Sequence, residues 1–373
     1  MDSSELNLRL QKLKEFLAQD PNNKALLADT FELARRLCDW QQASKYADHA
    51  IHLWSDPLWK LRAGEVALAQ LLWTDAERWF EEVRQDPSSG EDLRCAAEHQ
   101  LAEVMLHTGQ LDSGITLISA YFEGEAAVPA APASQILWLR LLHRVGRLPD
   151  ALDYAQRWEM ESTLSPQVAS VASLVALDAN RLDLAVRWAD MALQLKSGNR
   201  PFEALITRAS IALGQPDAGM AHALLSEALQ LKPRDGRTWA MMAFTVLLQQ
   251  QLDKAIEHFN TALNYMPGHV GTWHGLGWAL IQKRDLVRAK DVFQHALSLD
   301  RNFSESHGGL AVVLALMGDK EGASAAIEIA HKLDRNSAAV RYAVAVLSGD
   351  YLDPMKISRL AAQTISNTKK TTE

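Results

Sequence analysis

A period of 34 residues in the second half of the chain is the feature that most constrains its fold. From Gly236, a tryptophan stands at repeat position 4, alanines at positions 8, 20 and 27, a phenylalanine at 24 and a proline at 32. Repeats beginning at Phe202, Val270 and Ser304 keep this register of large and small residues without a gap. Such a period is typical of an array of supersecondary units that stack on one another.

The residue types at these positions predict pairs of antiparallel helices. Small residues at positions 8 and 20 let the two helices of a pair approach closely, and the residues at 4, 24 and 27 fill the gap to the next pair. One pair cannot bury both of its apolar faces, so pairs must stack. We therefore expect Trp239, Phe259, Trp273 and Phe293 to be packing residues.

Weaker copies of the pattern extend upstream, so that about nine repeats begin near residues 24, 57, 95, 132, 166, 202, 236, 270 and 304. The predicted organisation is irregular repeats with a capping helix (1–123), a Pro/Ala-rich loop (124–135), degenerate repeats (136–201), four regular repeats (202–337), C-terminal capping helices (338–366) and a disordered tail (367–373). The Pro/Ala-rich loop is either a hinge between two lobes or an inserted turn within a continuous array.

The six recurring positions resemble the signature of the tetratricopeptide repeat (TPR) family. The resemblance implies an all-α, right-handed superhelical solenoid of about nine helix-turn-helix repeats with capping helices. Arg301 and Arg335 depart from the pattern by replacing the closing proline, although the surrounding "LDRN" turns still read as helix ends.

Net charge and the distribution of apolar residues limit the classes of partner and the cellular location to expect. The net charge of −8 disfavours nucleic acid or an anionic membrane as the main partner. The N-terminus lacks the apolar core of a signal peptide, and no run of 18 apolar residues occurs, so we expect a cytoplasmic protein without membrane insertion. Cys38 and Cys95 lie far apart in apolar helical runs, where we expect small buried hydrophobes.

Motifs of catalysis are missing from the sequence: it contains no phosphate-binding glycine loop, no HExxH and no GxSxG. His49 and His52 stand three residues apart, but no third metal ligand is evident. We predict that the chain is not an enzyme and has no catalytic residues, no cofactor and no metal.

The resemblance also implies a concave groove lined by the first helix of each repeat. The candidate partner-binding residues there are Arg237, Met241, Phe244, Leu248, His274, Trp278, Gln282, Glu305 and Val312. They lack the Lys, Asn and Arg set that grips a carboxylate in chaperone-tail binders, so no carboxylate-clamp ligand is expected. The groove is either an open apolar surface for a protein or peptide with apolar anchors, or it is covered by the chain itself.

These observations favour a non-enzymatic, chaperone-like scaffold or adaptor for protein–protein interaction, and family analogy suggests a secretion or assembly complex as its setting. One alternative is a regulatory or substrate-recruiting subunit of a separately encoded enzyme. Another is a self-assembling component, such as a homodimer, in which the N-terminal tryptophans make the contact. Those tryptophans, which otherwise fill loose packing, are Trp40, Trp54, Trp59, Trp73 and Trp79.

Overall fold

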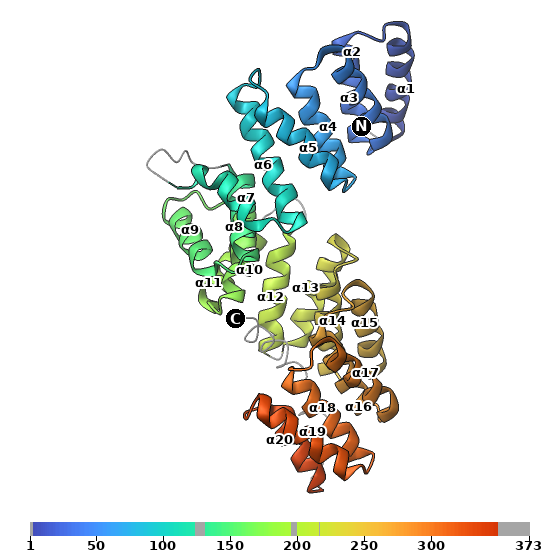
Figure 1. Cartoon of the computed structure of the whole chain (residues 1–373), viewed down its shortest axis with the longest axis vertical. Helices are drawn as coiled ribbons and strands as arrows, with labels where there is room; N and C mark the ends of the chain where they lie inside the picture. Colours follow the sequence, from blue (N-terminus) through green and yellow to red (C-terminus); the bar gives the residue numbers. More distant parts are fainter. Residues whose placement is uncertain (1–2, 124–130, 195–199, 216, 350–373) are drawn as a thin grey trace. The chain divides into compact units, whose positions relative to one another are not determined.

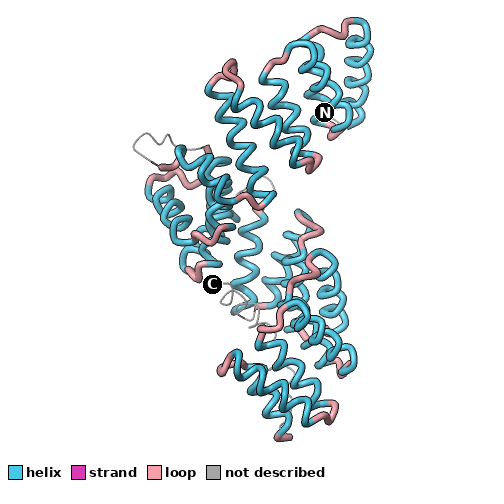
Figure 2. The backbone as a smooth tube through the Cα atoms, viewed as in Figure 1, coloured by secondary structure: helices cyan, strands magenta, loops and turns pink. Residues whose placement is uncertain are grey.

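A computed structural model of the chain describes residues 3–123, 131–194, 200–215 and 217–349. Within these residues the regular structure is entirely helical, with twenty α-helices and one short 3₁₀ helix joined by loops (Figures 1 and 2). The chain divides into two compact units, residues 1–180 and 181–373, which we call the N-terminal unit and the C-terminal unit.

The N-terminal unit contains α1 (Ser3–Gln19), α2 (Lys24–Arg36), α3 (Trp40–Trp54), α4 (Pro57–Ala69), α5 (Trp73–Gln85), α6 (Glu91–Thr108), α7 (Leu111–Ile118), η1 (Ser119–Tyr121), α8 (Pro132–Arg144), α9 (Leu148–Met160) and α10 (Pro166–Asp178). The C-terminal unit contains α11 (Leu182–Leu193), α12 (Phe202–Gly214), α13 (Ala218–Leu231), α14 (Gly236–Leu248), α15 (Leu252–Tyr265), α16 (Val270–Gln282), α17 (Leu286–Leu299), α18 (Ser304–Leu316), α19 (Lys320–Leu333) and α20 (Ala338–Leu347).

Consecutive helices pack as antiparallel pairs, as the repeat predicts. Four pairs, α2–α3 to α8–α9, belong to the N-terminal unit, and four, α12–α13 to α18–α19, belong to the C-terminal unit. The helices that open these pairs begin at the predicted residues, except that α6 begins at Glu91 rather than near residue 95. The predicted repeat near residue 166 is divided: α10 packs on α8 and α9, whereas α11 packs on α12.

Except in α12–α13, whose turn is only partly described, the turn inside each pair is built around one left-handed residue. In the pairs described with their turns, these residues are Cys38, Leu71, Gly109, Gly146, Gln250, Arg284 and Gly318, with φ between 57° and 86°. The next N–H then closes the helix end, as where Asp319 donates to the Leu314 carbonyl at 2.9 Å. Only the three glycines adopt this conformation without steric strain.

A recurring hydrogen bond ties each of the regular repeats at Gly236 and Val270 to the repeat before it. The indole N–H of Trp239 donates to the Pro233 carbonyl at 2.9 Å, and that of Trp273 donates to the Pro267 carbonyl at 2.7 Å. Position 4 of one repeat thus binds position 32 of its predecessor. This bond explains in part why a large residue with a polar edge recurs at position 4.

The predicted packing residues form the core of the C-terminal unit. Phe259 and Phe293 are fully buried, and so are the alanines at positions 20 and 27 of the four regular repeats. Trp239 and Trp273 are half-buried, with their indole nitrogens engaged as described. The five N-terminal tryptophans also pack on the buried clusters of their unit, and Trp59 is 1% exposed.

Some boundaries and environments differ from expectation. Residues 124–130 of the Pro/Ala-rich loop, the second C-terminal capping helix and the tail lie outside the described residues. The helix α8 begins at Pro132, inside the predicted loop, and packs on α6 and α7 of the same unit. The two compact units divide between residues 180 and 181, and the choice between hinge and inserted turn for residues 124–135 stays a prediction.

The expectation that both cysteines are buried is wrong. Cys38 is exposed because it occupies the left-handed turn position between α2 and α3, outside both helices. Cys95 is half-buried in the first half of α6.

Candidate functional site

The apolar residues expected to line an open groove lie in the core of the C-terminal unit. Met241 is 5% exposed, Phe244 is 1% exposed, and His274, Trp278 and Val312 are fully buried. Of the other four candidates, Leu248, Gln282 and Glu305 are half-buried and Arg237 is exposed.

Neighbouring helices cover these side chains. The ring of Phe244 meets Phe259 edge-on, with centroids 4.8 Å apart, and Trp278 meets Tyr342 of α20 at 5.9 Å. The burial favours the covered alternative for the five apolar and aromatic candidates. Partner binding at the nine positions stays a prediction.

His274 has a defined role in this core. The indole N–H of Trp278, one turn along α16, donates to His274 Nε2 at 2.6 Å. Because the indole can only donate, Nε2 must be unprotonated. Burial lowers the pKa of His274 to about 3, which keeps the imidazole neutral. Its Nδ1 has no hydrogen-bond partner in the described part of the chain.

Glu305 caps a helix. Its two carboxylate oxygens accept the backbone N–H groups of Ala338 at 3.3 Å and Ala339 at 3.2 Å, at the start of α20. The hydroxyl of Ser337 accepts the N–H of Val340 at 3.3 Å in the same first turn. Glu305 therefore stabilises the first turn of the helix that follows the last repeat.

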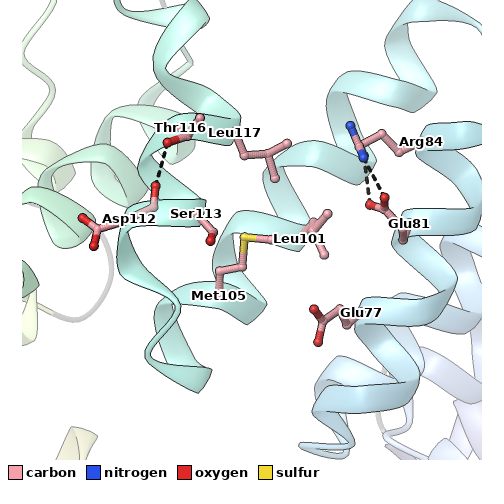
Figure 3. Close-up of a pocket in the computed structure, with 9 residues that line it drawn as sticks. All are labelled: Glu77, Glu81, Arg84, Leu101, Met105, Asp112, Ser113, Thr116 and Leu117. Atoms are coloured by element: carbon pink, nitrogen blue, oxygen red, sulfur yellow. Dashed lines mark hydrogen bonds and ion pairs between the residues drawn. The ribbon is translucent and has the colours of Figure 1, made fainter.

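An open cleft of about 640 Å³ lies in the N-terminal unit among α5, α6 and α7 (Figure 3). We call it the α5–α7 cleft. It is lined by Glu77, Glu81 and Arg84 of α5, Leu101 and Met105 of α6, and Asp112, Ser113, Thr116 and Leu117 of α7. Figure 3 shows Leu101, Met105 and Leu117 between the charged side chains of α5 and the polar side chains of α7.

The cleft combines an apolar floor with an acidic rim. Met105 and Leu117 are half-buried and so offer apolar surface, whereas Leu101 is only 2% exposed. Glu77 is half-buried, and Asp112 is exposed. Neither of these two carboxylates has a hydrogen bond or ion pair with another described side chain.

The cation of the cleft is already paired. Arg84 Nε donates to Glu81 Oε2 at 2.9 Å, and Arg84 Nη2 donates to Glu81 Oε1 at 2.6 Å. This fork of two hydrogen bonds lowers the pKa of Glu81 below its usual value. Since Arg84 and Glu81 neutralise one another, Glu77 and Asp112 give the cleft a net negative charge.

The described residues hold no group of three or more His, Cys, Asp or Glu side chains that is arranged to bind a metal ion. In the same part of the chain, no helix combines the length and apolar character needed to cross a membrane.

Comparison with known proteins identifies the repeat. Residues 270–303, which span α16, α17 and the following turn, match the sequence model described as "Tetratricopeptide repeat". The chain therefore contains a tetratricopeptide repeat (TPR) at these residues. Comparison with curated proteins gives no match for this TPR chain.

Solved structures similar to this TPR protein include three with TM-scores below 0.5. The APC/C hetero-tetramer Cut9–Hcn1 has a TM-score of 0.48 and 12% identity, covering 97% of this chain and 79% of that one. YrrB, a TPR protein with an unusual peptide-binding site, has a TM-score of 0.40 and 16% identity, covering 51% and 96%. MamA has a TM-score of 0.38 and 13% identity, covering 44% and 94%.

The α5–α7 cleft of this TPR protein is absent from the sequence-based predictions. One signal in the sequence points to it. Glu77 and Glu81 stand four residues apart on one face of α5, a like-charge spacing that destabilises an isolated helix. Their relation to Asp112 and Met105 depends on how three helices pack, which the repeat pattern alone does not specify.

Proposed function

We propose that this TPR protein is a non-enzymatic scaffold that holds a partner polypeptide, and that the α5–α7 cleft is a contact surface for it. The observation that carries the proposal is the cleft itself, where accessible apolar side chains lie beside two unpaired carboxylates. Elsewhere in the array, apolar side chains at the repeat positions are used to pack one helix pair on the next.

The form of the cleft suits a polypeptide better than a small molecule. Small-molecule sites enclose most of their ligand and converge a few polar groups on it. Here the Thr116 hydroxyl is already bonded to the Asp112 carbonyl of its own helix at 2.9 Å, and Arg84 is held by Glu81. A partner segment can instead place one side chain on Met105 and Leu117 while the rest of it lies on the rim, since a few anchors dominate interface energies.

A chaperone-like role, a place in a secretion or assembly complex, and a cytoplasmic location remain predictions from the sequence. Recruitment to a separately encoded enzyme and self-assembly remain the alternatives. The identity and stoichiometry of whatever binds will distinguish them.

The test compares the tagged full-length chain with two variants after purification from its native host. Ser113→Trp places a bulky ring in the cleft, and Gln11→Trp adds the same ring at an exposed position on α1. Mass spectrometry and light scattering then give the bound polypeptide and its stoichiometry.

We expect one polypeptide to accompany the wild type and Gln11→Trp in a fixed ratio and to be lost from Ser113→Trp. If neither the wild type nor either variant co-purifies with a polypeptide, the scaffold proposal is contradicted. A purely homomeric complex favours self-assembly, and a bound enzyme whose activity depends on this chain favours the recruiting-subunit alternative.

A further inference from the structure

We propose that the α5–α7 cleft selects a partner segment that carries one apolar anchor side chain flanked by lysine or arginine. This inference rests on the proposed scaffold function and specifies the chemistry of its partner. Two independent features of the cleft support it: the charge of its rim and the shape of its floor.

The rim calls for positive charge. Glu77 and Asp112 extend from different helices and lack partners among the described side chains, while the one cation of the cleft is neutralised by Glu81. A segment with cationic side chains gains an ion pair at each free carboxylate. Phosphate groups or acidic side chains meet unpaired carboxylates there and are repelled.

A small cation does not satisfy this arrangement. The described acidic side chains do not come together in any group of three or more suited to a metal ion, so the cleft offers no built cation site. Carboxylates on two different helices match a ligand whose positive charges are themselves separated along a chain.

The floor calls for an apolar anchor. Met105 and Leu117 present half-buried surface between the two sides of the rim (Figure 3). Methionine is flexible and adapts to different side-chain shapes, so this floor fits an aliphatic or aromatic anchor without demanding one residue type. Leu101, which also lines the cleft, is buried.

The test uses a phage-displayed library of random 12-residue peptides selected on the full-length chain. The double variant Glu77→Gln/Asp112→Asn removes the two free charges and keeps the side-chain shapes. Its matched control, Asp48→Asn/Asp153→Asn, removes two exposed charges of the same unit, from α3 and α9, without touching the cleft. A third variant, Met105→Gln, makes the floor polar. Circular dichroism checks that each variant is folded.

We expect the selected peptides to share an apolar residue flanked by lysine or arginine. The rim variant should weaken their binding by at least about fivefold at low salt, the control should leave it unchanged, and high salt should remove the difference. Met105→Gln should weaken binding at every salt concentration, because the apolar contact is not screened.

Three results overturn the inference. The first is that the selected peptides lack basic residues, and the second is that the rim variant and its control bind them equally well. The third result is that Ser113→Trp abolishes the binding of none of the selected peptides. These outcomes are distinct from failure of the scaffold function. If the native complex forms and survives Ser113→Trp, the scaffold function stands and the cleft is not its site.

Discussion

A Cβ atom placed on Gly277 would lie 2.5 Å from Cζ of Phe293, closer than real Cβ contacts allow. Gly277 is position 8 and Phe293 position 24 of the same repeat, so the pair sets the distance between α16 and α17. Gly64 and Phe80 stand in the same relationship in α4 and α5, again at 2.5 Å. A buried aromatic ring at position 24 therefore requires a very small residue on the facing helix.

We expect Gly277→Ala to destabilise the C-terminal unit by about 1–2 kcal/mol. Overpacking against the rigid Phe293 ring outweighs the better helix propensity of alanine, which is worth roughly 1 kcal/mol. Gly214→Ala is the control, because a Cβ on Gly214 at the end of α12 meets nothing within 4 Å. Urea unfolding should show opposite signs for the two variants, and a stabilised Gly277→Ala would refute this account of the packing.

Replacing Leu71 with glycine should stabilise the N-terminal unit. Leu71 has φ 60° in the turn between α4 and α5 and is 65% exposed, so it strains the backbone and buries little. Removing its Cβ should gain about 1 kcal/mol. The neighbouring Leu72, with φ −86°, is the control, since Leu72→Gly only loosens the chain. Thermal melting of both variants checks the prediction, which fails if Leu71→Gly melts at or below the wild-type temperature.

Glu305→Gln should loosen α20 without disturbing the earlier repeats. The substitution removes the negative charge and one acceptor from the first turn of that helix, a change worth about 1 kcal/mol. Hydrogen exchange of α20 should accelerate about fivefold, while Glu328→Gln, an exposed change on α19, should have no effect. Unchanged exchange in α20 would show that the cap contributes little.

Acidification should weaken the C-terminal unit through His274. Its pKa is about 3 in the folded chain and about 6.5 when unfolded, so between these values the unfolded chain binds the extra proton. Stability therefore falls as the pH drops from 6.5 toward 3, by up to about 1.4 kcal/mol per pH unit. His274→Gln cannot bind this proton and keeps an acceptor for Trp278. The urea midpoints of wild type and variant should lie closer together at pH 5 than at pH 7. An equal difference at both pH values would contradict the assignment.

The repeat sequence predicted the helix pairs well because its signals are local. Position 8 and position 24 residues such as Ala243 and Phe259 recur at fixed spacing, and their burial follows from pairing within one repeat. The start of α6 was missed by four residues because the irregular segment before it carries no repeat signal. The left-handed turn at Cys38 was missed because no glycine marks it.

The side chains of the candidate groove could not be placed from sequence. Trp278 is covered by Tyr342, which lies 64 residues later in the chain, so its exposure depends on how successive repeats stack. The α5–α7 cleft was missed for a related reason, because Glu77, Met105 and Asp112 come from three helices. Local patterns identify which residues pack within a pair, but not which surface the stacked pairs leave open.

The most direct test of the scaffold account is photo-crosslinking from inside the cleft. An aliphatic diazirine amino acid of about the size of leucine replaces Leu117 in the full-length chain, or Leu8 on α1 as the exposed control, and each is irradiated in native lysate. We predict one polypeptide adduct from position 117, absent from position 8 and suppressed by Glu77→Gln/Asp112→Asn. Equal adducts at both positions, or none at position 117, would contradict the account.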